Sequence, residues 1–339
     1  MARFKVVYVD GNRQAGVDWS VEREILATAD AELVVGACAT DDEVAELAAD
    51  ADGILNTMYF MNRALFERLP NVKVVVRGGV GYDNLDVEGA TDCGIVVCNV
   101  TDYGYNEVAN HAFAMLIALN RKLVQLDRAV RDGTRRPPPE VLAHTGRMAG
   151  ETLGLVAFGN IAQAVARRAK GFDLRVIAYD PYVEEAKAKA MDVELVPLEE
   201  LMRRSDYISV HTPLFEETRG LIGERELALM KPSAYIVITS RGGVIDEAAL
   251  VKALAAKQIA GAGIDVWVNE PVLEDNPLLQ FDNVLASQHN AWYSDVSPGV
   301  LRRRVAEAAA DVLRGVMPRS VVNPKVLQQV SLAPRPAES

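Results

Sequence analysis

Short apolar runs alternate with amphipathic segments over the first part of the chain. The apolar runs are typical of strands buried on both faces of a parallel sheet, whereas the amphipathic segments repeat with the period of a helix. The runs predict strands over residues 4–10, 31–38, 53–56, 72–77 and 95–99. The helical spacing predicts helices over residues 21–29, 41–49 and 62–69. Strands that alternate with helices indicate a parallel, doubly wound sheet.

The same alternation returns after residue 152 and predicts a second sheet. Its strands are predicted over residues 153–158, 174–179, 194–196, 207–211, 234–239, 260–266 and 283–286. Its helices are predicted over residues 160–170, 198–204, 224–230 and 247–256. The predicted fold class is therefore α/β, with two doubly wound parallel-sheet (Rossmann-like) domains and a cleft between them.

Two longer amphipathic helices, over residues 106–120 and 297–315, are expected to be the crossings between the domains. A discontinuous first domain is expected over residues 1–103 and 297–330, because the chain returns to it at its end. The second domain is expected over residues 104–296. Residues 331–339 are predicted to form a flexible tail. The proline-rich stretch 135–139 is predicted as a loop, because proline runs sustain neither helix nor sheet.

Residues 152–181 have the pattern of a dinucleotide-binding unit: strand, tight turn, helix, second strand and acid. The pyrophosphate of a dinucleotide binds exposed N–H groups at the start of such a helix. Here they belong to Phe158, Gly159, Asn160 and Ile161. Asp180 follows Gly159 at the expected offset of about 20 residues and would hydrogen-bond the ribose hydroxyls. Its carboxylate would repel a 2′-phosphate, which favours NAD as the cofactor.

The glycine pattern of this unit is incomplete. The motif G-x-G-x-x-G falls on Ala157, Gly159 and Ala162. Alanine is an accepted third residue. Ala157 costs about 1–2 kcal/mol if the turn requires a positive φ at that position. An ordinary strand–helix turn is the alternative for this motif alone, and the acid at Asp180 favours the cofactor site.

Three predicted strands in the second half end in polar side chains. Arg241 follows the strand 234–239, Asp265 and Glu270 lie at and after the strand 260–266, and His289 follows the last strand. Ligands of open α/β sheets bind at the carboxyl ends of the strands, so these ends should converge on one crevice. Singly, each residue has a structural alternative: a surface arginine, a turn acid or a structural histidine.

The net charge of −11 argues against a nucleic-acid partner, since nucleic-acid-binding surfaces are basic. The densest basic cluster, residues 302–304, lies in a helical pattern and is interpreted as a solvated helix face. No signal peptide and no apolar run long enough for a bilayer are found, so no membrane partner is expected.

The chain has an odd number of cysteines, Cys38, Cys93 and Cys98. Cys93 and Cys98 flank an apolar strand and are predicted to lie in the core. These features indicate a reducing, cytoplasmic location. The histidines lack metal-ligand spacing, and no metal site is predicted.

The polar strand ends, together with residues 77–86, 211–214, 217–222 and 241–247, resemble the D-isomer-specific 2-hydroxyacid dehydrogenase family. The resemblance runs from Val74 to Asn323. Within the family, residues 94–100, 179–182 and 291–294 are similar to the C-terminal-binding-protein-like branch.

This resemblance implies an NAD-dependent oxidoreductase that interconverts a 2-oxo acid and a D-2-hydroxy acid by hydride transfer. Arg241 would bind the substrate carboxylate, for which its fork of donors is suited. His289 would be the acid in reduction and the base in oxidation, with Glu270 hydrogen-bonded to its other ring nitrogen. The discontinuous domain would be the substrate (catalytic) domain, and residues 104–296 the NAD-binding domain.

The resemblance also implies the remaining contacts. Those to the cofactor are expected from Thr212, Pro213, Thr218, Thr239, Ser240, Asp265, His289 and Trp292. Those to the substrate are expected from Tyr59, Gly79, Val80, Gly81, Arg241 and Trp292. A further aromatic and apolar set would favour a medium-sized apolar 2-oxo acid: Met58, Tyr59, Phe60, Tyr103, Tyr105 and Trp292. A homodimer, formed through the second domain and residues 123–152, is implied in the same way.

Three further positions depart from the family pattern: Ile238 stands where asparagine is usual, and Ser287-Gln288 where Thr-Pro is usual. Gln288 leaves the loop before His289 freer than proline would. The rival interpretation is an NADH-sensing binding or scaffold protein of the C-terminal-binding-protein type, with little turnover. The intact set Arg241, Glu270 and His289 favours the enzyme.

Overall fold

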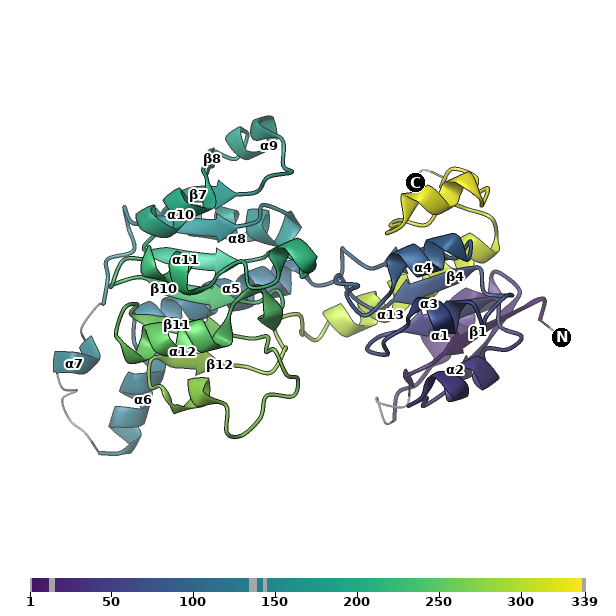
Figure 1. Ribbon diagram of the computed structural model, residues 1–339, viewed down its shortest axis with the longest axis horizontal. Coiled ribbons are helices and arrows are strands. Elements are labelled where there is room, and N and C mark those ends of the chain that lie inside the picture. Colours follow the sequence, from purple (N-terminus) through teal and green to yellow (C-terminus); the bar gives the residue numbers. More distant parts are fainter. Residues whose placement is uncertain (1, 12–15, 134–138, 143–144, 337–339) are drawn as a thin grey trace. The chain divides into compact units, whose positions relative to one another are not determined.

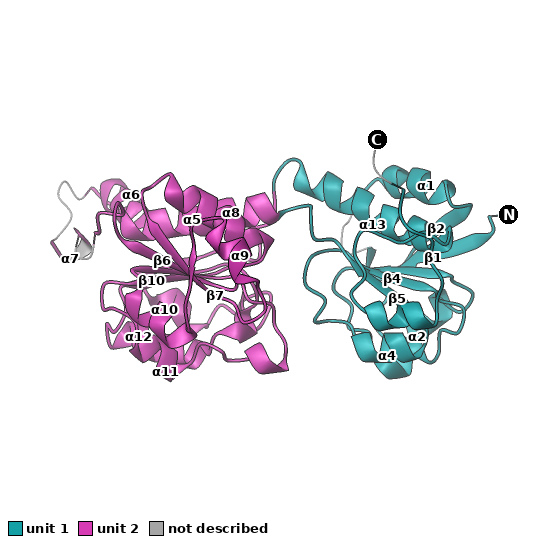
Figure 2. Cartoon of the chain, turned by 90° about the horizontal axis from the view of Figure 1, so that it is seen from above, with its two compact units in different colours: residues 1–104, 294–339 teal, residues 105–293 magenta. Residues whose placement is uncertain are grey.

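A computed structural model describes residues 2–11, 16–133, 139–142 and 145–336. The chain forms two compact units: Met1–Gly104 with Ser294–Ser339 is unit 1, and Tyr105–Tyr293 is unit 2 (Figure 2). The sequence placed the two crossings at 103/104 and 296/297. Most of the proline-rich stretch 135–139 lies outside the described residues; its last residue begins the short helix α7 (Pro139–Leu142).

Unit 1 is built on a parallel sheet of five strands in the order β2-β1-β3-β4-β5. Its strands are β1 (Phe4–Tyr8), β2 (Ala31–Val35), β3 (Gly53–Asn56), β4 (Val74–Arg77) and β5 (Val96–Asn99). Alternate side chains of one strand enter opposite cores: Val6 lies in one and Val7 in the other. Because both faces are covered, the strands are mainly apolar, as the sequence indicated; Lys5 in β1 and Glu32 in β2 are exceptions.

The helices of unit 1 cover both faces of this sheet (Figure 2). One face packs against α1 (Ser20–Ala27) and α13 (Ser297–Leu313), and the other against α2 (Asp41–Leu47), α3 (Arg63–Phe66) and α4 (Val87–Asp92). The sequence missed α4. Asp86 caps it by accepting the N–H of Gly89 at 2.8 Å, and a Cβ on Gly89 would lie 2.8 Å from Cβ of Arg63. A glycine inside the helix thus permits close packing on α3, at the expense of helix propensity.

Unit 2 contains a parallel sheet of seven strands in the order β12-β11-β10-β9-β6-β7-β8. Its strands are β6 (Thr152–Val156), β7 (Arg175–Tyr179), β8 (Glu194–Leu195), β9 (Tyr207–Val210), β10 (Tyr235–Ile238), β11 (Gly261–Ile264) and β12 (Val284–Ala286). The chain winds outward from β6 in one direction and then, from β9, in the other. The crevice at the carboxyl ends of β6 and β9 is where such sheets bind dinucleotides.

Helices also cover both faces of the second sheet (Figures 1 and 2). One face packs against α5 (Tyr105–Asn120) and α8 (Asn160–Lys170), and the other against α10 (Leu198–Arg204), α11 (Glu224–Ala228) and α12 (Glu247–Ala255). Two further helices are α6 (Leu123–Arg131) and α9 (Glu185–Lys189). The predicted fold class, two doubly wound parallel-sheet domains, is confirmed.

Two predictions about the ends and the core of unit 1 are wrong. Residues 331–336 were predicted as part of a flexible tail, but Ala333 forms a parallel bridge with Val316 and Leu332 packs on the core. Residues 337–339 lie outside the described residues. Cys93 is exposed rather than buried, because it follows the last turn of α4, whereas Cys98 in β5 is buried.

Candidate active site

The turn after β6 places its residues as a dinucleotide site requires, except at one position. Ala157 has φ +77°, the strained value that the missing glycine of the motif would have accommodated. Gly159, at the N-cap of α8, has open space where a Cβ would stand, so a ligand can approach its backbone. The first N–H groups of α8 have no partner within the helix, as at the start of any α-helix.

Phe158 does not present its own groups to a ligand. Its side chain is buried in the core, and its N–H donates to Oδ2 of Asp180 at 2.8 Å. The other oxygen of Asp180 accepts the N–H groups of Tyr182 at 2.9 Å and Val183 at 3.1 Å. These bonds fix the Asp180 carboxylate against the turn, with acceptor capacity left for a hydroxyl donor.

The loops after β9 and β10 leave buried polar atoms without a partner. Oγ1 of Thr239, Oγ of Ser240 and Nδ1 of His211 have no hydrogen-bond partner among the described residues. Burial lowers the pKa of His211 to about 3, so its ring is neutral at physiological pH. Unpaired buried polar groups are costly, and a ligand that pairs with them removes that cost. The residues present therefore fit a bound dinucleotide in unit 2.

Three other residues predicted to contact the cofactor also make contacts within the protein. Thr212 is buried and donates to the Val156 carbonyl at 3.3 Å. Oγ1 of Thr218 donates to the carbonyl of Pro213 at 2.7 Å and so closes the loop after β9. The Trp292 ring packs edge-on against Tyr293, with ring centroids 5.8 Å apart.

Replacing Ala157 with glycine should stabilise the protein. The left-handed conformation costs alanine about 1–2 kcal/mol. The greater freedom of glycine in the unfolded chain returns about 0.4–1 kcal/mol of that gain. We expect a net gain of roughly 0.5–1 kcal/mol in the free energy of unfolding, measured by urea titration. Ala162→Gly, inside α8, is the matched control and should lose about 1 kcal/mol; equal effects of both variants would contradict the strain at Ala157.

His289 and Glu270 form a pair at the carboxyl edge of the second sheet. Nδ1 of His289 lies 2.7 Å from Oε2 of Glu270, and the N–H of Trp267 donates to Oε1 of the same carboxylate at 3.1 Å. The two side chains are 33% and 27% exposed, so the other ring nitrogen can reach a substrate. A histidine held by a carboxylate through one nitrogen is the arrangement of a general acid and base.

Burial alone would raise the pKa of Glu270. The hydrogen bond and charge of His289, the Trp267 N–H and the charge of Arg241 together lower it below its usual range. Arg241 itself follows β10, and its Nη1 donates to the carbonyl of Ser240 at 2.9 Å. A Cβ on the next residue, Gly242, would lie 2.1 Å from the carbonyl carbon of Trp267. Only glycine permits this approach, which brings the Arg241 loop against the loop that carries Glu270.

Because its pKa is lower in the folded protein, ionised Glu270 stabilises the fold. This contribution is complete above the ordinary pKa of 4.5 and is lost as the pH falls through the lower folded value. We expect Glu270→Gln to have a lower melting temperature than the parent near neutral pH. The difference in melting temperature between the two proteins should become smaller as the pH falls below 4.5. Melting curves across this range test the prediction; a difference that is independent of pH would contradict it.

Asp265 supports the loop that carries His289. Its side chain is buried and accepts Oγ of Ser287 at 2.6 Å and the N–H groups of Asn290 at 2.9 Å and Ala291 at 3.0 Å. Its carbonyl accepts the N–H of His289 at 2.6 Å. His289 has φ +53°, a conformation that persists only where the surroundings fix it. The predicted contact of Asp265 with the nicotinamide carboxamide stays a prediction.

His111 and Ser287 are two site residues that the sequence did not reveal. Nε2 of His111, on α5, lies 3.0 Å from Oγ of Ser287, which in turn donates to Asp265. Ser287 was noted only as a departure from the family pattern, yet its hydroxyl joins α5 to the support of the His289 loop. A histidine in the middle of an apolar helix gave no signal of this contact.

Tyr59 and the glycine loop, predicted to bind substrate, lie in unit 1. Gly79 has φ +148°, a backbone conformation that other residues rarely adopt, so this position favours glycine. Val80 is half-exposed at the tip of the loop. Tyr59 is only 9% exposed and its hydroxyl donates to Asp41 at 2.7 Å, whereas Met58 and Phe60 are 49% and 59% exposed. The neighbours of Tyr59, rather than its ring, are therefore at the surface.

A buried carboxylate, Asp10, holds the segment around Tyr59. It lies after β1, at the point where the winding of the first sheet reverses. Its carboxylate accepts the N–H groups of Thr57 at 3.0 Å, Met58 at 2.5 Å and Tyr59 at 3.2 Å. These hydrogen bonds from Asp10 therefore fix the backbone conformation of residues 57–59.

A family model, described as "D-isomer specific 2-hydroxyacid dehydrogenase, NAD binding domain", matches residues 113–291. The chain belongs to this family. Within it, glyoxylate reductase from Korarchaeum cryptofilum is 41% identical over 287 residues, covering 84% of this chain and 86% of the relative. D-3-phosphoglycerate dehydrogenase from Methanocaldococcus jannaschii is 38% identical over 303 residues, covering 88% of this chain and 57% of the relative.

A solved structure of another dehydrogenase has the same fold. D-lactate dehydrogenase from Aquifex aeolicus, complexed with NAD and lactic acid, superimposes with a TM-score of 0.81 at 26% identity, covering 96% of this chain and 98% of that chain. The protein is an NAD-dependent D-2-hydroxyacid dehydrogenase, so the predicted family and cofactor are confirmed. The finer placement in the C-terminal-binding-protein-like branch stays a prediction.

The described part of the chain contains neither a membrane-spanning helix nor a cluster of metal ligands. No helix there combines the length and the apolar character that a membrane crossing requires. Within the same ranges, no three His, Cys, Asp or Glu side chains gather closely enough to hold a metal ion.

Proposed function

We propose that this dehydrogenase interconverts a 2-oxo acid and a D-2-hydroxy acid with His289 as the acid and base. The observation that carries the proposal is the 2.7 Å contact between Nδ1 of His289 and Glu270. It leaves Nε2 as the nitrogen that exchanges a proton with the substrate oxygen. Bound NADH would supply the hydride in reduction, and bound NAD⁺ would accept it in oxidation.

In reduction, the C2 carbon of the substrate receives a hydride and its oxygen receives a proton. His289 gives this proton from Nε2 and takes one back in the reverse direction. Glu270 orients the ring and keeps its charge while the proton moves. Arg241 binds the substrate carboxylate through its guanidinium fork, and its loop is held in place by the contact of Gly242 with Trp267.

The remaining contacts are proposed from the family resemblance and from the groups that the structure exposes. Gly159, Asn160 and Ile161 offer backbone N–H groups to the pyrophosphate, and Asp180 accepts from the ribose. Thr239 and Ser240 have hydroxyls that a ligand can pair. The loop of Gly79, Val80 and Gly81 offers N–H groups to the substrate carboxylate, and Trp292 limits the room for the substrate side chain.

We propose a medium-sized apolar 2-oxo acid as substrate, rather than a phosphorylated one. The exposed side chains of Met58 and Phe60, beside the fixed backbone of Tyr59, offer an apolar surface. The two relatives are named for a small acid, glyoxylate, and for a phosphorylated one. A panel that contains glyoxylate, pyruvate, branched-chain 2-oxo acids and 3-phosphohydroxypyruvate separates these cases.

The test is NADH oxidation by the purified protein with this panel. Turnover that is highest on an unphosphorylated 2-oxo acid with an apolar side chain supports the proposal. Highest turnover on the phosphorylated acid would retain the reaction and overturn the substrate assignment. Tight NADH binding without turnover on any acid would instead support an NADH-sensing binding protein of the C-terminal-binding-protein type.

A homodimer is proposed as the assembled form. Helix α6 has no buried residue in the single chain, and its apolar side chains Leu123 and Val130 are 52% and 74% exposed. Such side chains are commonly covered by a partner. The molar mass in solution, measured by light scattering, tests the assembly; the mass of one chain at micromolar concentration would contradict it.

A further inference from the structure

The end of strand β5 holds the glycine loop of unit 1 through two hydrogen bonds. Nδ2 of Asn99, the last residue of the strand, donates to the carbonyl of Val80 at 2.6 Å. The N–H of the next residue, Val100, donates to the carbonyl of Gly79 at 2.9 Å. The Asn99 side chain is buried, although it is polar. Two consecutive carbonyls of the loop are therefore fixed by the end of β5.

These two bonds also set the direction of the N–H groups in the same peptide planes. A trans peptide is planar, and its N–H points away from its C=O. The bond to the Gly79 carbonyl therefore orients the N–H of Val80, and the bond to the Val80 carbonyl orients the N–H of Gly81. Each of these N–H groups points away from the end of β5.

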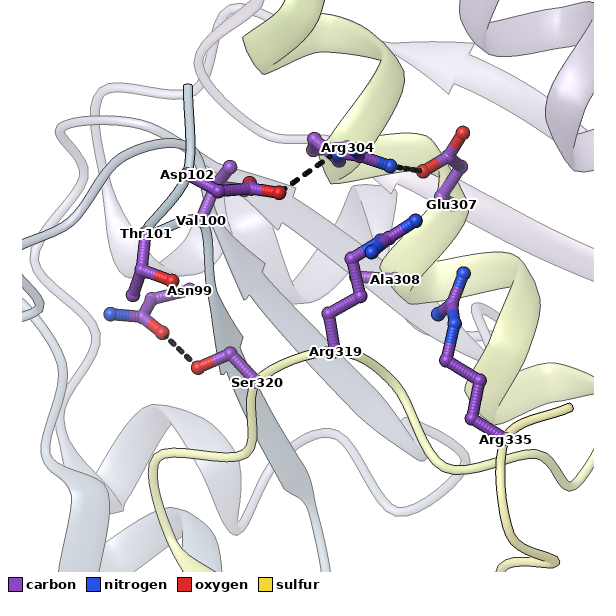
Figure 3. Close-up of a pocket in the computed structure, with 10 residues that line it drawn as sticks. All are labelled: Asn99, Val100, Thr101, Asp102, Arg304, Glu307, Ala308, Arg319, Ser320 and Arg335. Carbon is purple, nitrogen blue, oxygen red and sulfur yellow. Dashed lines mark hydrogen bonds and ion pairs between the residues drawn. The ribbon is translucent and has the colours of Figure 1, made fainter. Parts of the chain in front are cut away.

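Ser320 keeps the amide of Asn99 in one orientation. A carbonyl oxygen only accepts hydrogen bonds, so the amide nitrogen of Asn99 must face Val80, and the amide oxygen is left for another donor. That donor is Oγ of Ser320, which lies 2.5 Å from Oδ1 of Asn99. Figure 3 shows the amide oxygen turned toward Ser320 and the amide nitrogen turned away from it. An amide rotated by half a turn would lose both bonds.

The segment that carries Ser320 is fixed along β5, the edge strand of the first sheet. The N–H of Val322 donates to the carbonyl of Val97 at 2.8 Å, and Oδ1 of Asn323 accepts the N–H of Val97 at 2.8 Å. Nδ2 of Asn323 donates to the carbonyl of Ile95 at 2.9 Å. These contacts fix the position of Ser320 relative to the strand.

We propose that Asn99 is a positioning residue for substrate binding, and that Ser320 keeps its amide in the required orientation. This inference rests on the proposed function, in which the glycine loop binds the substrate carboxylate. Asn99 acts through the loop, by aiming the N–H of Gly81 at that carboxylate. Since this contact binds the ground state and the transition state alike, its loss should raise KM and leave kcat unchanged.

Asn99→Asp tests the inference, because it keeps the size of the side chain and places a carboxylate oxygen against the Val80 carbonyl. We expect KM for the 2-oxo acid to rise about tenfold or more, the usual effect of losing a hydrogen bond to a charged group. The value of kcat should stay within about twofold of the parent. The Kd for NADH, whose proposed site lies in unit 2, should not change.

Two substitutions of Ser320 test the orientation of the amide. Ser320→Ala removes the donor to Oδ1 of Asn99 and should raise KM about two- to tenfold, the usual effect of losing a hydrogen bond between neutral groups. Ser320→Thr keeps the hydroxyl and should retain the parent KM. If Asn99→Asp does not fold, these two variants decide the question by themselves.

Asn323→Asp is the matched control. It makes the same chemical change at another buried asparagine beside β5, where Nδ2 donates to the carbonyl of Ile95 rather than to the glycine loop. It should lower the melting temperature and retain the parent KM. An equal rise of KM in Asn99→Asp and Asn323→Asp would mean that any damage to β5 has this effect, and would overturn the inference.

The outcomes separate this inference from the proposed function. Turnover by the parent, with an unchanged KM in both Asn99→Asp and Ser320→Ala, would overturn the role of Asn99 alone. A lower kcat at an unchanged KM would overturn it as well. A parent without turnover on any acid of the panel would overturn the proposed function, and the inference with it.

Discussion

Replacing His289 with alanine is expected to lower kcat by about 10²–10⁴-fold, the usual contribution of a general acid or base. The variant lacks the imidazole that is paired with Glu270, and with it the proposed proton donor to the substrate oxygen. The fold should survive, because the side chain is one-third exposed and only its ring is removed. The measurement is NADH oxidation at saturating concentrations of the 2-oxo acid found in the substrate panel, with NADH affinity determined in parallel.

The matched control is Gln288→Ala, which shortens the exposed neighbouring side chain of the same loop. It should keep most of the parent kcat. Added imidazole should restore part of the activity of His289→Ala and none of the activity of an inactive variant at another position. If His289→Ala and Gln288→Ala both retain the parent kcat, the proton comes from another group and the proposed mechanism is wrong.

Replacing Asp265 with alanine is expected to cause the largest loss of stability. The change leaves three donors, from Ser287, Asn290 and Ala291, without their acceptor in a buried position. Each unsatisfied buried donor costs about 1–3 kcal/mol, so the loss should be at least about 3 kcal/mol. For a domain of this size, each kcal/mol lowers the melting temperature by about 2–4 °C. Differential scanning calorimetry measures this loss.

Asp246→Ala removes the same chemical group from a different setting. Asp246 is exposed and accepts the N–H groups of Ala248 at 2.9 Å and Ala249 at 3.1 Å as the N-cap of α12. Water can replace this acceptor, so the loss should be about 1 kcal/mol. Asp265→Asn, which keeps one acceptor oxygen, should lie between the two. Equal losses from Asp265→Ala and Asp246→Ala would contradict the role of Asp265 as the buried support of the His289 loop.

Hydrophobic periodicity determined most of the fold, because it is a local property that a strand or helix carries in its own residues. Strands buried on both faces must be mainly apolar, and the strands of both sheets therefore stand out in the sequence. The short helices α4 and α9 carry no such pattern. Helix α4 forms because Asp86 caps it and because Gly89 lets it approach Arg63, and the second of these reasons lies outside the helix.

In the glycine motif, a single residue separates what the sequence predicts from what the folded backbone decides. The sequence indicated that Ala157 would be strained if the turn required a positive φ, and only the backbone decided that it does. The left-handed conformation follows from the geometry of the turn between β6 and α8, which the identity of Ala157 does not encode.

The sequence by itself indicated which chemical groups to expect in the proposed site, since Arg241, Glu270 and His289 stand in recognisable order after apolar strands. The tertiary structure alone decided their contacts: the pairing of Glu270 with His289, the support of that loop by Asp265 and Ser287, and the burial of the Tyr59 ring. Hydrogen bonds and ion pairs require ångström-scale distances between segments far apart in sequence, and no local pattern specifies those distances.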